Sequence, residues 1–277
     1  MWEWLAFVAL GAAVGFAGGY AGIGGAPFLV VGLALLLGYD QHVAQGTVLA
    51  VMLGPMSLPA VIVMWDRVKL LKREIFIGVA CYAIISYFGA QIAYAMDARQ
   101  LQILFGAFLF ALGLRYVLKY KSTIFNTSDS ADIENTPIVA ELNPNGPTVL
   151  GGVLPFTIPI IVILSCIKGA VGGMFGIGAG VLMVPAFISL CGLHKDDARA
   201  LSLAILLPPV SIGAALEYQA NDGIVWPTAL VIFVVYFATN AIGAKIGRKH
   251  DTNKFLFWLG ILLAGIAAVL IGKHILS

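Results

Sequence analysis

The first scarcity in this sequence is charge. Its 277 residues include 16 Lys or Arg and 14 Asp or Glu, so that only 11% are charged while 60% are hydrophobic. The mean hydropathy is +0.97. A soluble domain of this length needs far more charge to cover its surface, so the composition predicts an all-α polytopic membrane protein. The net charge of +2 is too small to favour a nucleic-acid partner.

Catalytic and metal-binding motifs are also missing. The three cysteines lie singly in apolar runs and form no CxxC pair, which predicts inert buried thiols. No zinc-protease, nucleophile-elbow, phosphate-loop or paired acidic motif is present. A membrane-embedded enzyme is therefore disfavoured, and no cofactor or metal is expected. The first residues carry no basic region of a signal peptide, so we expect the first apolar segment to belong to the mature protein.

Long apolar runs are abundant, and a membrane helix needs roughly 20 such residues. Gly/Pro interruptions shorten some of them, and we expect about 8–10 membrane segments. The runs lie near 4–20, 27–38, 43–64, 75–95, 101–119, 149–170, 180–192, 198–218, 226–247 and 254–275. A polar stretch at 121–147 divides the chain into a first membrane repeat (1–120), a cytoplasmic linker and a second membrane repeat (148–277).

The two halves match at one constant offset of 154 residues, which indicates an internal duplication. The matched pairs include Gly15 with Gly169, Gly22-Ile23-Gly24 with Gly176-Ile177-Gly178, Leu49-Ala50 with Leu203-Ala204, Pro55 with Pro209, Ser57 with Ser211, and Tyr82 with Tyr236.

Basic residues occupy non-equivalent loops in the two halves. The first half has Arg67, Lys69, Lys72 and Arg73 in one loop, whereas the matching loop at Ala220 to Trp226 has no Lys or Arg. The second half instead has its basic loop one connection later, around Lys245 and Lys254. Because short cytoplasmic loops collect Lys and Arg, this predicts inverted repeats with both termini external. Inverted repeats are typical of secondary transporters.

Glycine interrupts one apolar run in each half, in "GGYAGIGGAPFL" (18–29) and "GGMFGIGAGVLM" (172–183). Irregular backbone at membrane depth is tolerated where protein or a water-filled cavity covers it. A helix that begins after such a break directs free N–H groups at one place, which suits an anion. Close helix packing is the alternative reading. The candidate anion-binding residues here are Gly22, Gly24, Gly25, Ala26, Gly176, Gly178, Ala179 and Gly180.

Proline breaks a second helix in each half, at 53–59 and 207–213, and a serine follows each break. Ser57 and Ser211 either contact the ligand or satisfy backbone groups freed by proline. Further candidates are polar residues on the same helices, a lysine four residues before the second glycine break, and an arginine at a helix start. They are Gln45, Thr47, Ser202, Lys168 and Arg199. Lys168 either balances an anion or extends to the membrane surface, and Arg199 either binds the anion or marks the cytoplasmic side.

These repeated glycine breaks, each followed by a short helix, together with Ala44-Gln45-Gly46-Thr47, resemble the sulfite exporter TauE/SafE family of bacterial membrane transporters. The resemblance covers essentially the whole chain. It implies export of sulfite, organosulfonates or related sulfur-containing anions across the bacterial cytoplasmic (inner) membrane. The second half departs from the motif, because Ala198-Arg199-Ala200-Leu201 stands where the first half has Ala44-Gln45-Gly46-Thr47.

The sequence therefore predicts a secondary transporter working by alternating access. Its expected partners are a small anionic substrate and the lipid bilayer. Another organic anion such as a carboxylate, and a passive anion channel, stay open as alternatives. Coupling to a proton or a sodium ion and assembly as a homodimer also stay open.

Overall fold

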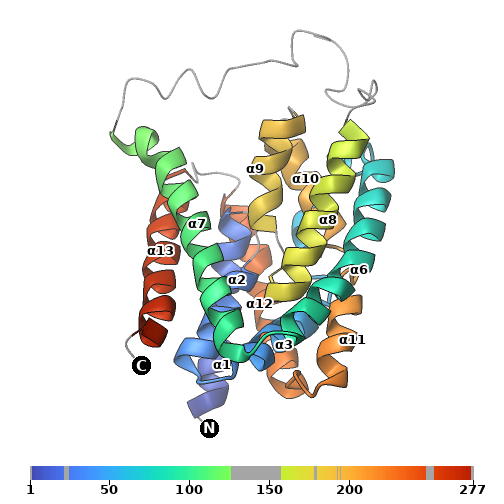
Figure 1. Ribbon diagram of the computed structural model, residues 1–277. Helices are drawn as coiled ribbons and strands as arrows, with labels where there is room; N and C mark the ends of the chain where they lie inside the picture. The colour runs from blue at the N-terminus through green and yellow to red at the C-terminus, as the bar shows by residue number, and fades with distance from the viewer. Residues whose placement is uncertain are drawn as a thin grey trace, which may run out of the picture.

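A computed structural model describes residues 2–21, 25–125, 157–177, 180–191, 193, 195–247 and 253–275. Every regular element within these ranges is a helix (Figure 1). The first half comprises α1 (Trp2–Ala21), α2 (Ala26–Val31), a π-helical turn η1 (Gly32–Leu36), α3 (Gln41–Val51), α4 (Leu58–Val63), α5 (Trp65–Val68), α6 (Lys72–Tyr94) and α7 (Ala98–Phe125). The second comprises α8 (Thr157–Phe175), α9 (Gly180–Cys191), α10 (Lys195–Ile205), α11 (Ile212–Ala220), α12 (Trp226–Gly247) and α13 (Asn253–Ile275).

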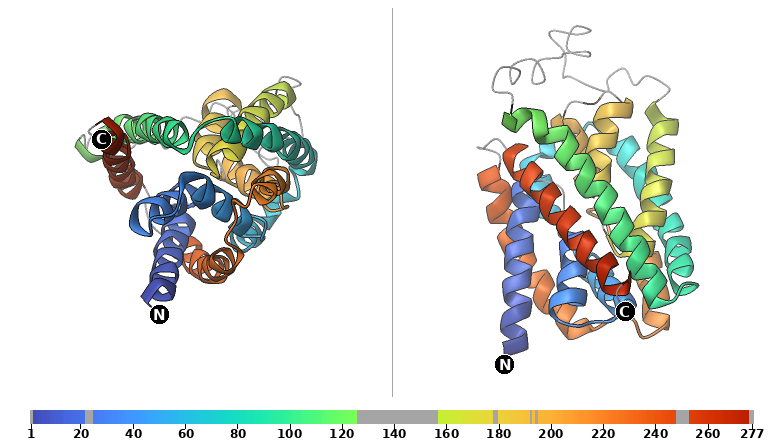
Figure 2. Two further views of the ribbon diagram at one scale, coloured as in Figure 1. Left: turned by 60° about the horizontal axis from the view of Figure 1, so that its bottom comes forward. Right: turned by 60° about the vertical axis from the view of Figure 1, so that its left-hand side comes forward.

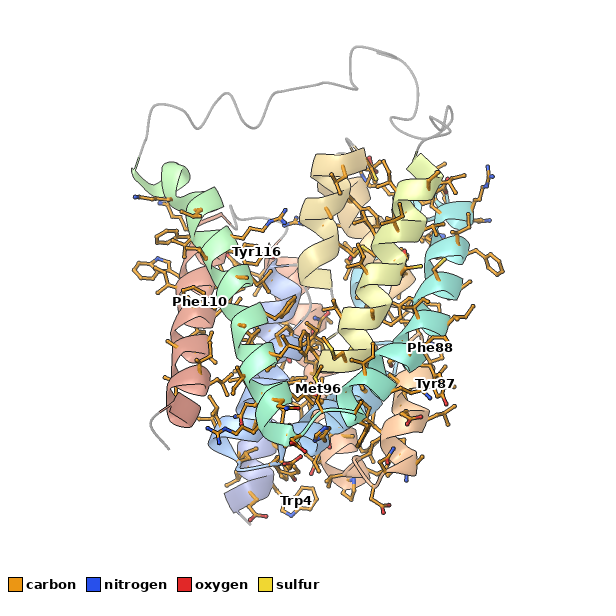
Figure 3. The ribbon with its side chains drawn as sticks, in the orientation of Figure 1. Trp4, Tyr87, Phe88, Met96, Phe110 and Tyr116 are labelled. Atoms are coloured by element: carbon orange, nitrogen blue, oxygen red, sulfur yellow. The ribbon has the colours of Figure 1, made fainter. Side chains whose placement is uncertain are left out.

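Five of the described helices, α1, α6, α7, α8 and α12, are long and apolar enough to cross a membrane. Their outward faces are apolar, as expected for contact with lipid rather than water. On α6, Phe76 is 75% exposed and Phe88 is 53% exposed, and Figure 3 places Phe88 beside Tyr87 on the outer side of the bundle. The expectation of an all-helical, multi-pass membrane protein is thereby confirmed at this level.

The long helices pack as three pairs. Helix α1 lies along α12, α6 lies along α8, and α7 lies along α13, as Figure 2 shows. Small residues permit this close approach. A Cβ atom on Gly89 of α6 would lie within 3.0 Å of the backbone of Ala170, and one on Gly243 of α12 would lie within 3.0 Å of the backbone of Phe16. The two contacts are equivalent at the 154-residue offset, at which Gly89 corresponds to Gly243 and Phe16 to Ala170.

Two short helices of the first half, α2 and α3, are largely buried in the bundle. On α2, Leu29 and Val30 are fully buried, and α3 is buried from Ala44 to Val51. Two of the predicted long runs are each two helices. In the run 43–64, α3 ends at Val51 and α4 begins at Leu58, and the run 198–218 likewise divides into α10 and α11. Proline causes the breaks because it supplies no N–H for the helical ladder.

The ends of the bundle differ. Both chain termini lie at one end, and the helices that flank residues 126–156 point to the other, the linker end (Figure 1). Helix α7 continues five residues beyond the predicted linker boundary, to Phe125. The rest of the predicted linker and residues 149–156 of the predicted run 149–170 lie outside the described residues.

Candidate functional site

The two serines that follow the proline breaks make reciprocal hydrogen bonds between the halves. The Ser57 hydroxyl donates to the carbonyl oxygen of Leu203 at 2.9 Å, and the Ser211 hydroxyl donates to that of Leu49 at 3.3 Å. Both pairs match at the 154-residue offset. Both serines are buried, so each satisfies a helix-end carbonyl of the opposite half. The sequence left open a bond to backbone groups freed by the serine's own proline break or contact with a ligand, whereas the observed bonds go to carbonyls of the opposite half.

The first glycine break lies against α12. The Gly25 N–H donates to the Tyr236 hydroxyl at 3.1 Å, and the Asn240 amide donates to the same oxygen at 3.4 Å. Gly25 and Ala26 are buried where α2 begins. The Gly25 N–H is therefore already used within the protein. Gly22 and Gly24 lie outside the described residues.

The second break lies against α3. Gly176 has φ of +67°, and a Cβ there would lie 2.7 Å from the carbonyl oxygen of Gln45. The buried Gln45 side chain accepts a hydrogen bond from the Tyr218 hydroxyl at 2.9 Å, and the same hydroxyl lies 3.2 Å from the Met174 carbonyl. Only glycine combines this backbone conformation with so close an approach. Gly180 begins α9, and Gly178 and Ala179 lie outside the described residues.

Four buried polar side chains near the second break form what we term the Lys168 cluster: Tyr82, Ser165, Lys168 and Ser202. Each has a side-chain nitrogen or oxygen atom with no hydrogen-bond partner within the described part of the chain. Lys168 is 2% exposed, and its Nζ lies 5.4 Å from the centre of the Tyr82 ring, a cation–π distance. Such burial excludes the alternative that Lys168 extends to the membrane surface.

Three helices hold this cluster together. A Cβ on Gly78 of α6 would lie 3.2 Å from the Ser165 hydroxyl of α8 and 2.9 Å from Cγ1 of Ile205 on α10. Ser202 lies one helical turn before Ile205, and Lys168 lies one turn after Ser165. The Tyr82 hydroxyl lies beside Gly172, where a side chain would collide with it. Small residues thus create the space for these polar groups.

A second polar group lies on α3 and at the end of α6. Both polar atoms of Gln41, the Gln45 Nε2 and the Tyr94 hydroxyl are buried without a partner among the described residues. The Tyr94 ring lies between two others, stacking on His42 at 5.0 Å and meeting Tyr218 edge-on at 4.8 Å. Since Tyr218 also contacts Gln45, this group adjoins the Gly176 break.

The two remaining candidates from the sequence, Thr47 and Arg199, belong to neither of these polar groups. The buried Thr47 hydroxyl accepts a hydrogen bond from the Val225 N–H at 3.1 Å, which holds the turn before α12. Arg199 is half-buried on α10, one turn before Ser202. The structure thus places Lys168 over the Tyr82 ring and Gln45 beside Gly176, but it places Thr47 and the two break serines in backbone contacts.

Several polar residues of this region were not predicted as site residues. Ser165 could have been found from its position one turn before Lys168. Tyr82 was visible only as the match of Tyr236. Gln41 and Tyr94 carried no signal in the sequence, because their neighbours lie far away along the chain, and Tyr218 was visible only as a residue at the end of a helix.

The surroundings of the matched tyrosines Tyr82 and Tyr236 predict different effects of hydroxyl removal on stability. Tyr236→Phe leaves the buried Gly25 N–H without its acceptor, which costs about 1–3 kcal/mol. Tyr82→Phe removes a hydroxyl that has no partner among the described residues, so we expect an unfolding free energy close to that of the wild type. Thermal unfolding in detergent measures both, and an equal loss in the two variants would contradict this assignment.

Comparison with known proteins finds relatives that match over nearly the whole chain. The chain is 25% identical over 279 residues to "Probable membrane transporter protein YunE" of Bacillus subtilis, covering 98% of each protein. It is 23% identical over 266 residues to a "Probable membrane transporter protein" of Xylella fastidiosa, covering 95% of this chain and 93% of that one. It is 25% identical over 278 residues to "Probable membrane transporter protein MJ0441" of Methanocaldococcus jannaschii, covering 95% of this chain and 92% of that protein. No solved structure matches the chain.

The family model described as "Sulfite exporter TauE/SafE" matches residues 7–270, and therefore includes both halves and every residue of the Lys168 cluster. The resemblance noted from the glycine breaks and Ala44-Gln45-Gly46-Thr47 is thereby confirmed. The apolar helices and the names of the relatives agree on membrane transport. This chain belongs to the sulfite exporter TauE/SafE family of membrane transporters.

Proposed function

We propose that this protein is a secondary transporter that exports a small sulfur-containing anion, sulfite or an organosulfonate, across the bacterial cytoplasmic membrane. The observation that carries the proposal is the Lys168 cluster, in which a buried ammonium group lies over the Tyr82 ring, and both this group and the buried hydroxyls of the cluster have no hydrogen-bond partner in the described residues. A charge removed from water without a counter-charge costs several kcal/mol. A bound anion would offset that cost.

The chemistry of the cluster suits an oxyanion. The ammonium group of Lys168 carries three donors, and each hydroxyl of Tyr82, Ser165 and Ser202 carries one. Charge-assisted hydrogen bonds are the strong ones, and they favour small anions with several oxygens, such as sulfite or a sulfonate headgroup. We assign the anion to this cluster rather than to the Gly25 N–H, which already donates to Tyr236.

An inverted-repeat arrangement is supported by the way contacts exchange between halves. The α1–α12 pair corresponds to the α8–α6 pair at the 154-residue offset, and α7–α13 corresponds to itself. The reciprocal bonds of Ser57 and Ser211 follow the same exchange. With the positive-inside rule, the basic linker end faces the cytoplasm and both termini face outward.

Alternating access would require the contacts between the halves to rearrange. At the linker end, Arg67 of α5 pairs with Asp197 of α10 at 2.8 Å, and Asp197 is 5% exposed on its side chain. This ion pair joins the two halves near the end that we assign to the cytoplasm. Its breakage, together with the reciprocal serine bonds, would let one half rock against the other.

The test is transport in proteoliposomes of the purified protein. Sulfite, an alkyl sulfonate and acetate are compared as substrates, first for net flux and then for counterflow against a trapped unlabelled anion. We expect saturable counterflow with sulfite or the sulfonate preferred over acetate. Preference for acetate would favour a carboxylate transporter, and flux without counterflow would favour a passive channel; either result contradicts the proposal.

A further inference from the structure

An apolar groove of about 300 Å³ lies on the outside of the bundle at the linker end. Its walls come from α5, from the first two turns of α6, and from Pro208 in the break between α10 and α11. Trp65 is 55% exposed and Phe76 is 75% exposed. Such exposed apolar surface on a membrane protein faces lipid.

Positive charge lies at one end of this groove. Lys69 and Lys72 both line it, and both are exposed. Lys69 pairs with Asp66 at 2.8 Å, and this hydrogen bond, with the charge of Lys69, holds the pKa of Asp66 below its usual range. The side chain of Asp66 is 92% exposed, so the pair is a surface ion pair. Such a pair contributes little to the stability of the fold, and it leaves the Lys69 ammonium group available to another anion.

The matching place in the second half is filled and carries no lysine. At the 154-residue offset, Val79 and Pro208 correspond to Phe233 and Gly54, and the Phe233 ring lies directly against Gly54. Lys69 and Lys72 correspond to Gly223 and Trp226. The groove therefore has no counterpart at the matching position of the second half. Only the position in the first half has both an open groove and two lysines.

We propose that this groove binds one anionic phospholipid, with an acyl chain along Phe76, Val79 and Pro208 and the phosphate between Lys69 and Lys72. The apolar walls match a hydrocarbon chain. Each methylene group of the chain that lies in the groove adds van der Waals contacts with these walls. The two ammonium groups match a phosphate at the level of the headgroups, where basic side chains attract anionic lipids. Trp65 lies at the same level, as aromatic residues at membrane interfaces do.

The position of Pro208 connects the lipid to the rest of the bundle. Pro208 lies in the break that ends α10, and Ser211, three residues later, donates to Leu49 across the two halves. A bound acyl chain would therefore contact the segment at which the halves meet. The lipid site itself does not depend on which anion is transported.

The test is native mass spectrometry of the purified protein mixed with equal amounts of phosphatidylglycerol and phosphatidylcholine that have the same acyl chains. We expect the wild type to retain phosphatidylglycerol in preference. The double variant Lys69→Gln/Lys72→Gln should weaken this preference about 25-fold, since each lysine near anionic lipid contributes roughly a fivefold factor. Val79→Phe, which copies Phe233 of the second half, should reduce retention of both lipids while the lysines remain.

Lys245→Gln is the matched control, because Lys245 is an exposed lysine of α12 that does not line the groove. It should retain phosphatidylglycerol as the wild type does. The proposal is overturned if the wild type shows no preference for the anionic lipid, if Lys245→Gln loses as much as the double variant, or if Val79→Phe retains lipid unchanged. The two groove lysines are exposed, so their replacement leaves the core intact and the result interpretable.

Discussion

Replacing Lys168 with methionine is expected to abolish anion transport and, at the same time, to stabilise the protein. Methionine keeps much of the length of the side chain and removes the buried charge. Loss of the ammonium group removes the counter-charge of the anion, which should lower transport at least about 100-fold, the effect of truncating one partner of a buried charge pair. The folded protein gains several kcal/mol because no ion is buried without a partner.

The measurements are proteoliposome flux and thermal unfolding with and without sulfite. The wild type should unfold at a higher temperature when sulfite is present, whereas Lys168→Met should not respond. Lys245→Met, which removes a lysine at the end of α12, should transport and respond as the wild type does. A Lys168→Met protein that keeps sulfite transport, or one that is both inactive and strongly destabilised, would contradict the role assigned to this ammonium group.

A single methyl group at Gly176 is expected to abolish transport, whereas the same change at Gly38 is tolerated. Both glycines have left-handed backbone conformations, with φ of +67° and +71°. Alanine in that conformation costs about 1–2 kcal/mol. At Gly176 the methyl group would also lie 2.7 Å from the Gln45 carbonyl oxygen, whereas a Cβ at Gly38 has nothing within 4 Å. Overpacking adds roughly 1–3 kcal/mol.

Gly176→Ala should therefore lose about 2–5 kcal/mol of stability and displace Gln45 from Tyr218, and flux should fall below detection. Gly38→Ala should lose only the roughly 1–2 kcal/mol that the left-handed backbone conformation costs alanine, and its flux should equal that of the wild type. Unfolding by heat and flux in proteoliposomes are measured on the same preparations. Equal losses in the two variants would mean that backbone conformation alone matters at Gly176, and that its contact with α3 has no role.

Sequence patterning was sufficient for the local features of the fold. The run 226–247 coincides with α12, because an uninterrupted apolar stretch of that length has one stable conformation in a bilayer. The proline breaks at 53–59 and 207–213 were predicted because proline acts on its own helical turn. The constant offset also predicted which residues correspond between the halves, and the reciprocal bonds of Ser57 and Ser211 follow that correspondence.

The site depended on distances that the sequence does not contain. Lys168 was predicted as a candidate, but Tyr82 on α6 and Ser202 on α10 join it only because α6 packs along α8 and meets α10. The matched residues Tyr82 and Tyr236 have different surroundings, since the Tyr236 hydroxyl accepts from Gly25 while that of Tyr82 has no partner in the described ranges. No local pattern distinguishes the two.

The sequence by itself determined the membrane class, the duplicated helical order, the positions of the breaks and the family, because apolar length, glycine, proline and residue spacing act locally. The tertiary structure decided which polar groups are buried together and which N–H and hydroxyl groups are already used. That outcome depends on helix packing across about 80–150 residues of chain, as in the bond from Ser57 to Leu203, 146 residues away, and such packing follows from the shape of the whole bundle.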